Sequence, residues 1–112
     1  MLEKDKLNIL SVNDAITKIL TYSKSYSNAD DFHKNQRDFD AAMMNFIIIG
    51  EMVARLTEKF VEQNRHVDWF KIRGFRNIVA HNYFGIDAEE VWQIINTHLP
   101  KLKKEIKKIL MK

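Results

Sequence analysis

One short segment of the sequence, RGFRNIVAHNYFGID at positions 73–87, concentrates side chains suited to acid–base and phosphate chemistry. Within the eleven positions 73–83 lie Arg73, Arg76, Asn77, His81 and Tyr83. Histidine titrates near neutral pH and can act as a general base or a general acid. Arginine stays charged and can bind a phosphate through two parallel hydrogen bonds. Cleavage of RNA by its own 2′-hydroxyl needs both kinds of group and no metal ion, so the segment favours this chemistry.

Each side chain of the segment has an expected role. We expect Arg76 to bind the scissile phosphate and His81 to be the titrating group, with Arg73 and Asn77 in support. Tyr83 offers a hydroxyl that can donate to a phosphate or be modified itself. Structural alternatives stay open, because Arg76 could form an ion pair with Glu51 and His81 could satisfy a carbonyl at a helix end.

The spacing within this segment limits how the side chains can meet. Arg76 and Tyr83 are seven residues apart and share one face of a straight helix. His81 is five residues from Arg76, which places it roughly 140° away at about 100° per residue. Either the helix loosens before His81, or the site is completed across a two-fold dimer that supplies a second histidine.

The elements that hold the segment are expected to be helices, since the chain has three glycines, one proline and no strand-like alternation. Asp68 should cap the motif helix, which runs from Trp69 towards Tyr83 and stops at Gly85. Asp87 and Glu90 form a capping-box-like pair for the next helix. Further helices are expected over residues 2–24 and 38–63, with 25–36 as a connection or frayed helix start. Pro100 should open a final turn-rich or helical segment, 101–112. We predict an all-α bundle of four or five helices in one domain, 1–112.

The long helix expected over residues 38–63 carries two apolar stripes. The first can pack in the monomer core, and the second, formed by Met44, Ile48 and Met52, needs a further helix or a second subunit. A homodimer is therefore expected. Gly50 interrupts this helix without a turn signal nearby, which indicates close backbone approach at a helix crossing.

Composition excludes several other classes of protein. The formal net charge of +3 is uneven: residues 101–112 carry +5 and the other hundred sum to −2. The basic tail is therefore either a solvated helix face or a weak guide for RNA. The chain has no cysteine for disulfides or thiolate metal sites. No metal or cofactor is expected, and Asp30, Asp31 and His33 are interpreted as a solvated loop. The apolar run 41–50 is too short to span a membrane and the N-terminus does not resemble a signal peptide, so a cytoplasmic protein is expected.

The motif segment and its flanks resemble those of a known protein family. Arg76-x4-His81-x-Tyr83 is similar to the Arg-x4-His-x-Tyr motif of HepT toxins in the HEPN superfamily, and the flanks Trp69, 47–51 and 83–87 are similar as well. The resemblance implies a helical homodimer whose motifs face one another in a cleft. It also implies an RNA-cleaving toxin with an MntA-type nucleotidyltransferase antitoxin, which transfers AMP to the motif tyrosine, here Tyr83.

Two other readings stay open. The chain could be a catalytically silent HEPN module that binds a nucleotidyltransferase or nucleic acid, or a purely structural helical dimer. The joint presence of Arg76, His81 and Tyr83 favours the enzyme over the structural dimer. It does not separate the enzyme from the silent module.

Overall fold

A computed structural model describes residues 1–81 and 87–112, with backbone alone at positions 80 and 81. The described residues form helices and no strand, which confirms the all-α prediction. The elements are α1 (Glu3–Ser23), α2 (Ala29–Lys34), α3 (Gln36–Ala54), α4 (Glu58–Gln63), α5 (Trp69–Arg73), α6 (Phe75–His81), α7 (Ala88–Gln93), the π-helical turn η1 (Ile94–His98) and α8 (Leu99–Leu110).

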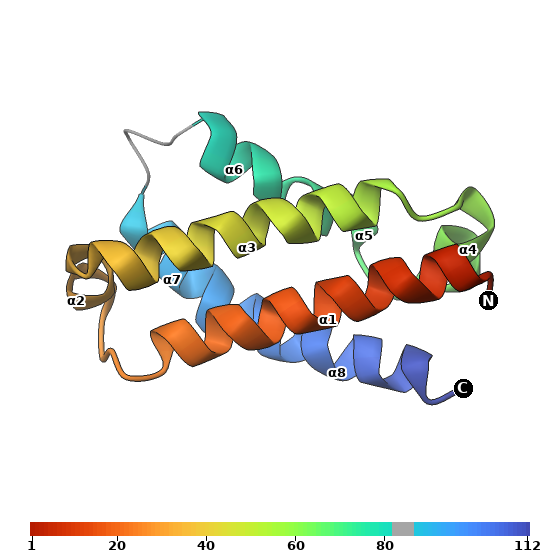
Figure 1. Cartoon of the computed structure of the whole chain (residues 1–112), viewed down its shortest axis with the longest axis horizontal. Coiled ribbons are helices and arrows are strands. Elements are labelled where there is room, and N and C mark those ends of the chain that lie inside the picture. Colours follow the sequence, from red (N-terminus) through yellow and green to blue (C-terminus); the bar gives the residue numbers. More distant parts are fainter. Residues whose placement is uncertain (82–86) are drawn as a thin grey trace.

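The elongated molecule is organised around two long helices, α1 and α3, which lie side by side with opposite directions (Figure 1). Helix α8 packs on α1, and α6 packs on the side of α3 away from α1. The apolar residues that predicted the first helix, Ile9, Val12, Ile16 and Ile19, are fully buried. The expected bounds of this helix, 2–24, agree with α1 to one residue at each end.

The single long helix expected over residues 38–63 is wrong, because the chain breaks between α3 and α4. Thr57 occupies the N-cap of α4, and its hydroxyl accepts a hydrogen bond from the Phe60 N–H at 3.2 Å. Asp5 of α1 is 1% exposed, and its carboxylate accepts from the Thr57 N–H at 2.9 Å and the Thr57 hydroxyl at 2.7 Å. The break is therefore fixed by a contact with the start of the chain.

The stretch expected to be a connection or frayed helix start contains a defined short helix, α2. The Asn28 side chain caps α2 through the Asp31 N–H, and Asn35 caps α3 through the Asp38 N–H. Phe32 anchors the helix because it is 1% exposed and packs against Phe39. The sequence did not predict this helix because its composition is polar, and Phe32 is the one large apolar side chain that it buries.

The motif helix expected from Trp69 towards Tyr83 is interrupted at Gly74, which separates α5 from α6. The predicted cap is confirmed, because the Asp68 side chain accepts from the Lys71 N–H at 3.0 Å. Gly74 ends α5 with its N–H on the Phe70 carbonyl, and its own carbonyl then accepts from Asn77 and Ile78. The predicted stop at Gly85 lies outside the described residues.

The last helical region begins at the predicted Asp87 cap, whose carboxylate accepts from the Glu89 and Glu90 N–H groups. Pro100 opens the final helix as expected, since it stands in the first turn of α8, and α7, η1 and α8 follow one another without a gap. Proline cannot donate to the carbonyl four residues earlier and its ring crowds that carbonyl. The wider turn of η1 precedes it, with the Leu99 N–H bonded to Ile94, five residues back.

Candidate functional site

The floor of the site is a close crossing of α3 with the α5–α6 segment at Gly50. A Cβ added at Gly50 would lie 2.7 Å from the Cβ of Arg76 and 3.1 Å from the carbonyl oxygen of Arg73. The prediction of close backbone approach at Gly50 is confirmed. The absence of a side chain at this position lets both arginine-bearing turns rest directly on α3.

Arg76 is held by its neighbour across this crossing. Its Nη1 donates to Oε1 of Glu51 at 2.8 Å, and the two side chains are 31% and 45% exposed. The ion pair left open by the sequence is therefore present. The pair occupies one N–H group of the guanidinium, and no other described residue hydrogen-bonds to this side chain. Arg76 thus retains donors for a phosphate while its position is fixed.

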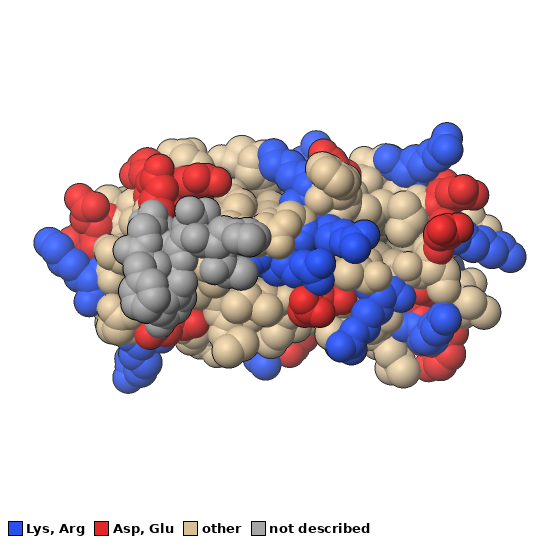
Figure 2. All heavy atoms as spheres, turned by 90° about the horizontal axis from the view of Figure 1, so that it is seen from above, with Lys and Arg blue, Asp and Glu red and all other residues tan. Residues whose placement is uncertain are grey.

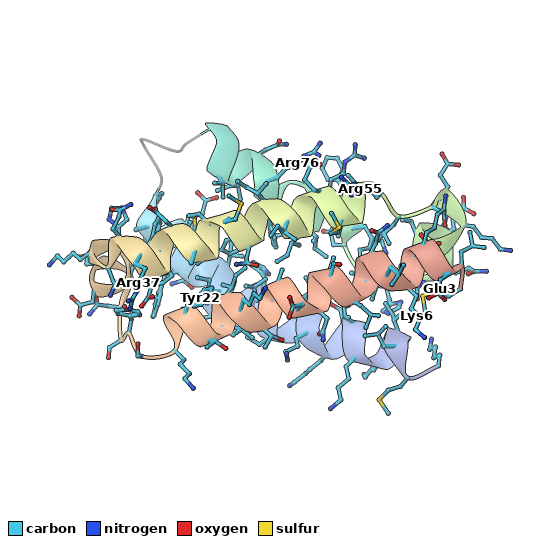
Figure 3. The ribbon with its side chains drawn as sticks, viewed as in Figure 1. Glu3, Lys6, Tyr22, Arg37, Arg55 and Arg76 are labelled. Atoms are coloured by element: carbon cyan, nitrogen blue, oxygen red, sulfur yellow. The ribbon has the colours of Figure 1, made fainter. Side chains whose placement is uncertain are left out.

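Further positive charge lies on the same side of the molecule. Arg73 and Asn77, the two expected supporting residues, are exposed on α5 and α6. Arg55, which caps the end of α3, is exposed, and Figure 3 places it with Arg76 on the upper side of the bundle. Figure 2 shows Lys and Arg side chains gathered across the middle of this face, with carboxylates among them. Such a surface suits an anionic ligand.

The other two motif residues are less fully described. His81 ends α6, which is helical without interruption from Phe75, so the alternative in which the helix loosens before His81 is wrong. Its side chain is outside the description, and Tyr83 lies outside the described residues altogether. The geometry of Arg76 towards these two side chains therefore remains a prediction, and so does completion of the site across a dimer.

A cavity of about 390 Å³ lies beside the crossing, between the end of α3, α4 and α5. Its lining combines apolar, aromatic and charged side chains: Val53, Ala54, Leu56, Glu58, Val61, Glu62, Trp69, Phe70 and Arg73. Sequence reasoning missed Phe70, Glu58 and Glu62. These residues line a cavity because the chain leaves the helix between positions 54 and 58, which allows α4 to pack near α5. In the sequence, Thr57 as a possible helix cap is the one sign of this break.

A second polar cluster lies on the opposite side of α5, where Nζ of Lys71 is 3.2 Å from Nε2 of His98. Partial burial, together with the charges of Lys71 and Lys101, lowers the pKa of His98 below its ordinary value. A histidine among charged residues of the sequence is expected at the surface, yet His98 is half-buried in η1. His33 and His66 are exposed, as expected.

Other expectations concern metal ions, membranes and the aromatic core. Among the described residues no group of three or more His, Asp or Glu side chains could hold a metal ion. No described helix is long and apolar enough to cross a membrane. Trp69 is buried, and its indole N–H donates to the Asn64 carbonyl at 2.9 Å.

Comparisons with known proteins place the chain among ribonuclease-like sequences. The profile of the family described as "Ribonuclease HepT-like" matches residues 12–109. A Methanocaldococcus jannaschii protein named "Gamma-glutamylcyclotransferase and putative RNase" is 33% identical over 105 residues, 94% of this chain and 47% of that protein. The chain thus spans about half the length of this relative.

Two further relatives are matched over most of their own length. A "Putative RNase" of the same organism is 36% identical over 98 residues, 86% of this chain and 84% of that protein. A Thermococcus cleftensis protein named "Probable ribonuclease HepT" is 25% identical over 80 residues, 71% of this chain and 73% of that protein. No solved structure matches the chain.

Proposed function

Since this chain belongs to the HepT-like ribonuclease family of the HEPN superfamily, we propose that it is a metal-independent endoribonuclease and the toxin of a prokaryotic toxin–antitoxin module. The observation that carries the proposal is the Arg76 guanidinium, fixed by Glu51 on the rigid crossing at Gly50 with donors left for a phosphate. A charged group positioned in advance stabilises the added negative charge at phosphorus as the bond breaks.

The reaction needs one proton acceptor and one proton donor. One His81 accepts the proton of the 2′-hydroxyl while that oxygen attacks the phosphorus. The bond to the 5′-oxygen breaks, and that oxygen takes a proton from a second histidine. The products are a 2′,3′-cyclic phosphate and a 5′-hydroxyl. Arg76 binds the phosphate throughout, and Arg73 and Asn77 steer the RNA strand.

The second histidine is His81 of the partner subunit in a two-fold homodimer. Two features support this part of the proposal. The five-residue spacing lies on a continuous helix, α6, and ideal helix geometry predicts that such a spacing separates two side chains by roughly 140°. Met44 of the second apolar stripe is 58% exposed, which leaves a face of α3 for a partner.

The test is cleavage of defined RNA by purified protein in the presence of a chelator. Loss of a positioned acid or base costs about a hundred- to ten-thousand-fold in rate, and His81→Ala should show a loss of this size. Arg76→Ala should fall comparably. The matched controls are His66→Ala and Arg65→Ala, which change exposed residues outside the site.

Circular dichroism establishes that each variant is folded. A folded His81→Ala protein that cleaves at the parent rate rejects the assignment. A parent protein that binds RNA without cutting it would instead be the silent HEPN module.

Control of the toxin by its antitoxin completes the proposal. An MntA-like nucleotidyltransferase would transfer AMP to the Tyr83 hydroxyl, which adds a bulky anion beside the arginines and blocks RNA. Support comes from the motif spacing and the family alone. Intact-mass spectrometry after co-expression with such a partner should show AMP additions on the parent and none on Tyr83→Phe. Additions that persist in Tyr83→Phe would exclude this tyrosine as the acceptor.

A further inference from the structure

The cavity between α3, α4 and α5 has no role in the proposed cleavage, yet it borders the proposed phosphate site. Arg73 lines the cavity, while the backbone carbonyl of the same residue rests against Gly50 beside the Cβ of Arg76. The cavity volume of about 390 Å³ is within the range of about 300 to 1,000 Å³ typical of small-molecule sites. A ligand group here would lie next to a phosphate bound at Arg76.

Phe70 makes this cavity unusual. It is 90% exposed, whereas the other phenylalanines among the described residues are at most 3% exposed: Phe32, Phe39, Phe46, Phe60 and Phe75. Its neighbour Trp69 is buried and forms part of the cavity lining from below. An exposed aromatic ring beside an arginine is the arrangement with which proteins bind unpaired bases of single-stranded RNA, by stacking.

The charged residues that line the cavity are two carboxylates on α4 and one arginine on α5. Glu58 and Glu62 are one turn apart on α4, and Arg73 ends α5. Among the described residues neither glutamate is in an ion pair. Carboxylates repel a phosphate and accept hydrogen bonds from N–H groups. A nucleotide would therefore enter base first, with its phosphate left at the arginines.

The two carboxylates also discriminate between bases. Guanine alone presents two adjacent donors on its pairing edge, N1–H and the N2 amino group, which match the two oxygens of one carboxylate. Adenine and cytosine each pair one amino donor with a ring acceptor, and uracil has a single N–H between two carbonyls. An acceptor facing a carboxylate is repelled, so only guanine satisfies the group fully.

We propose that this cavity is a guanine-binding subsite, in which the base stacks on Phe70, its pairing edge meets Glu58 or Glu62, and its phosphate is held by Arg73. This inference rests on the proposed function, because the base that the cavity binds belongs to the RNA substrate. It adds a base preference next to the cleavage position, which the motif residues alone do not supply.

The test uses short single-stranded RNA oligonucleotides in which one guanosine is replaced by inosine or adenosine. Inosine lacks the N2 amino donor and adenosine lacks both donors. Affinity is measured with 2′-deoxy substitution at every position, so that no strand is cut, and cleavage is mapped separately on the all-ribose strands. We expect affinity to fall from guanosine to inosine to adenosine, and cuts to cluster beside guanosine.

Three variants report on the subsite. Phe70→Ala should weaken binding about 5- to 150-fold, the range of a lost base stack, and its exposure makes loss of folding no concern. Glu58→Gln and Glu62→Gln should each be measured, and the one that contacts the base should reduce the guanosine-over-adenosine ratio towards one. Leu7→Ala, at 56% exposure, and Glu3→Gln on α1 are the matched controls and should leave affinity and preference unchanged.

The outcomes separate this inference from the proposed function. Guanosine-selective binding without cleavage would support the subsite and reject the ribonuclease. Cleavage by the parent with equal use of all four bases, or a preference that survives both glutamine substitutions, would overturn the subsite alone. A change of oligomeric state in Phe70→Ala with unaltered base preference would also overturn it, and would assign the ring to an interface between copies of the chain.

Discussion

The ion pair between Glu51 and Arg76 is too exposed to contribute much to the stability of the fold. Ion pairs at such positions contribute about 0 to 1 kcal/mol, since water and salt screen them. Its geometric effect is larger, because one Nη1 contact fixes the direction of the whole planar guanidinium. Glu51 is therefore interpreted as a positioning residue for Arg76.

Glu51→Gln tests this role. The thermal midpoint should change little, while kcat for RNA cleavage should fall about ten- to a hundred-fold because Arg76 is less well aimed. KM should change much less than kcat in steady-state assays. Glu3→Gln is the control. Tighter RNA binding with an unchanged kcat would mean that Glu51 only neutralises the arginine.

The Lys71–His98 contact predicts a measurable titration. Burial first, and then Lys71 and Lys101, lower the pKa of His98 below its ordinary value of 6.5. Lys71→Gln should raise this pKa partway back, since burial remains, and proton NMR of the imidazole measures it. Lys4→Gln, a lysine that is not among the charges acting on His98, should leave the pKa unchanged.

The same shift has a consequence for stability. The folded protein binds the His98 proton less readily than the unfolded chain does, so this group weakens folding as pH falls through 6.5 towards the folded pKa. Lys71→Gln should reduce that loss. A His98 pKa unchanged by Lys71→Gln would show that the contact at 3.2 Å does not act on the ring in solution.

At the scale of elements, the crossing at Gly50 should tolerate no side chain. Alanine in place of glycine usually stabilises a helix by roughly 0.5 to 1 kcal/mol. Gly50→Ala should instead destabilise by about 1 to 3 kcal/mol in chemical denaturation, because the new Cβ meets the Arg76 Cβ at 2.7 Å. Gly74→Ala, whose nearest atom is 3.2 Å away, should cost less. Equal losses of stability in the two variants would contradict the claim that the close contact at Gly50 excludes a side chain.

The break between α3 and α4 depends on Asp5, a residue far from it in the sequence, so a substitution at Asp5 tests it. Asp5→Ala leaves the half-buried Thr57 N–H and hydroxyl without their acceptor, a loss of about 1 to 3 kcal/mol in the free energy of unfolding. Glu3→Ala on the same helix is exposed and should have little effect. An Asp5→Ala protein as stable as Glu3→Ala would mean that water replaces the carboxylate.

Periodicity predicted which stretches are helical, and it failed where a distant contact decides the outcome. The apolar rhythm continues past Arg55, so Thr57 is only a weak local sign of a break, and its hydrogen bonds with Asp5 cannot be seen in the sequence. Nothing in the local pattern marks Gly74 as a break in the motif helix, although it separates α5 from α6 where both arginine-bearing turns meet α3. The identities of the motif residues were visible in the sequence, whereas the cavity formed by α4 and α5 follows from these two breaks.

At the scale of the whole molecule, the second apolar stripe is only partly covered. Ile48 and Met52 pack against the core, and Met44 remains 58% exposed on α3. Met44→Lys should shift the protein from dimer to monomer in light scattering at micromolar concentration, and RNA cleavage should fall with it. Leu7→Lys changes an equally exposed residue on α1 and is the control. If Leu7→Lys dissociates the dimer and Met44→Lys does not, the interface between subunits lies on α1 and not on α3.

The placement of α6 has a further consequence. This helix packs mainly on α3, whereas α1 packs against both α3 and α8 (Figure 1). A segment attached to one face of a core can open without disrupting that core. Backbone amides of α6 should therefore exchange with solvent deuterium sooner than those of α1 and α3. The arginine that we propose binds the phosphate is thus carried by an element whose local opening the rest of the fold would survive.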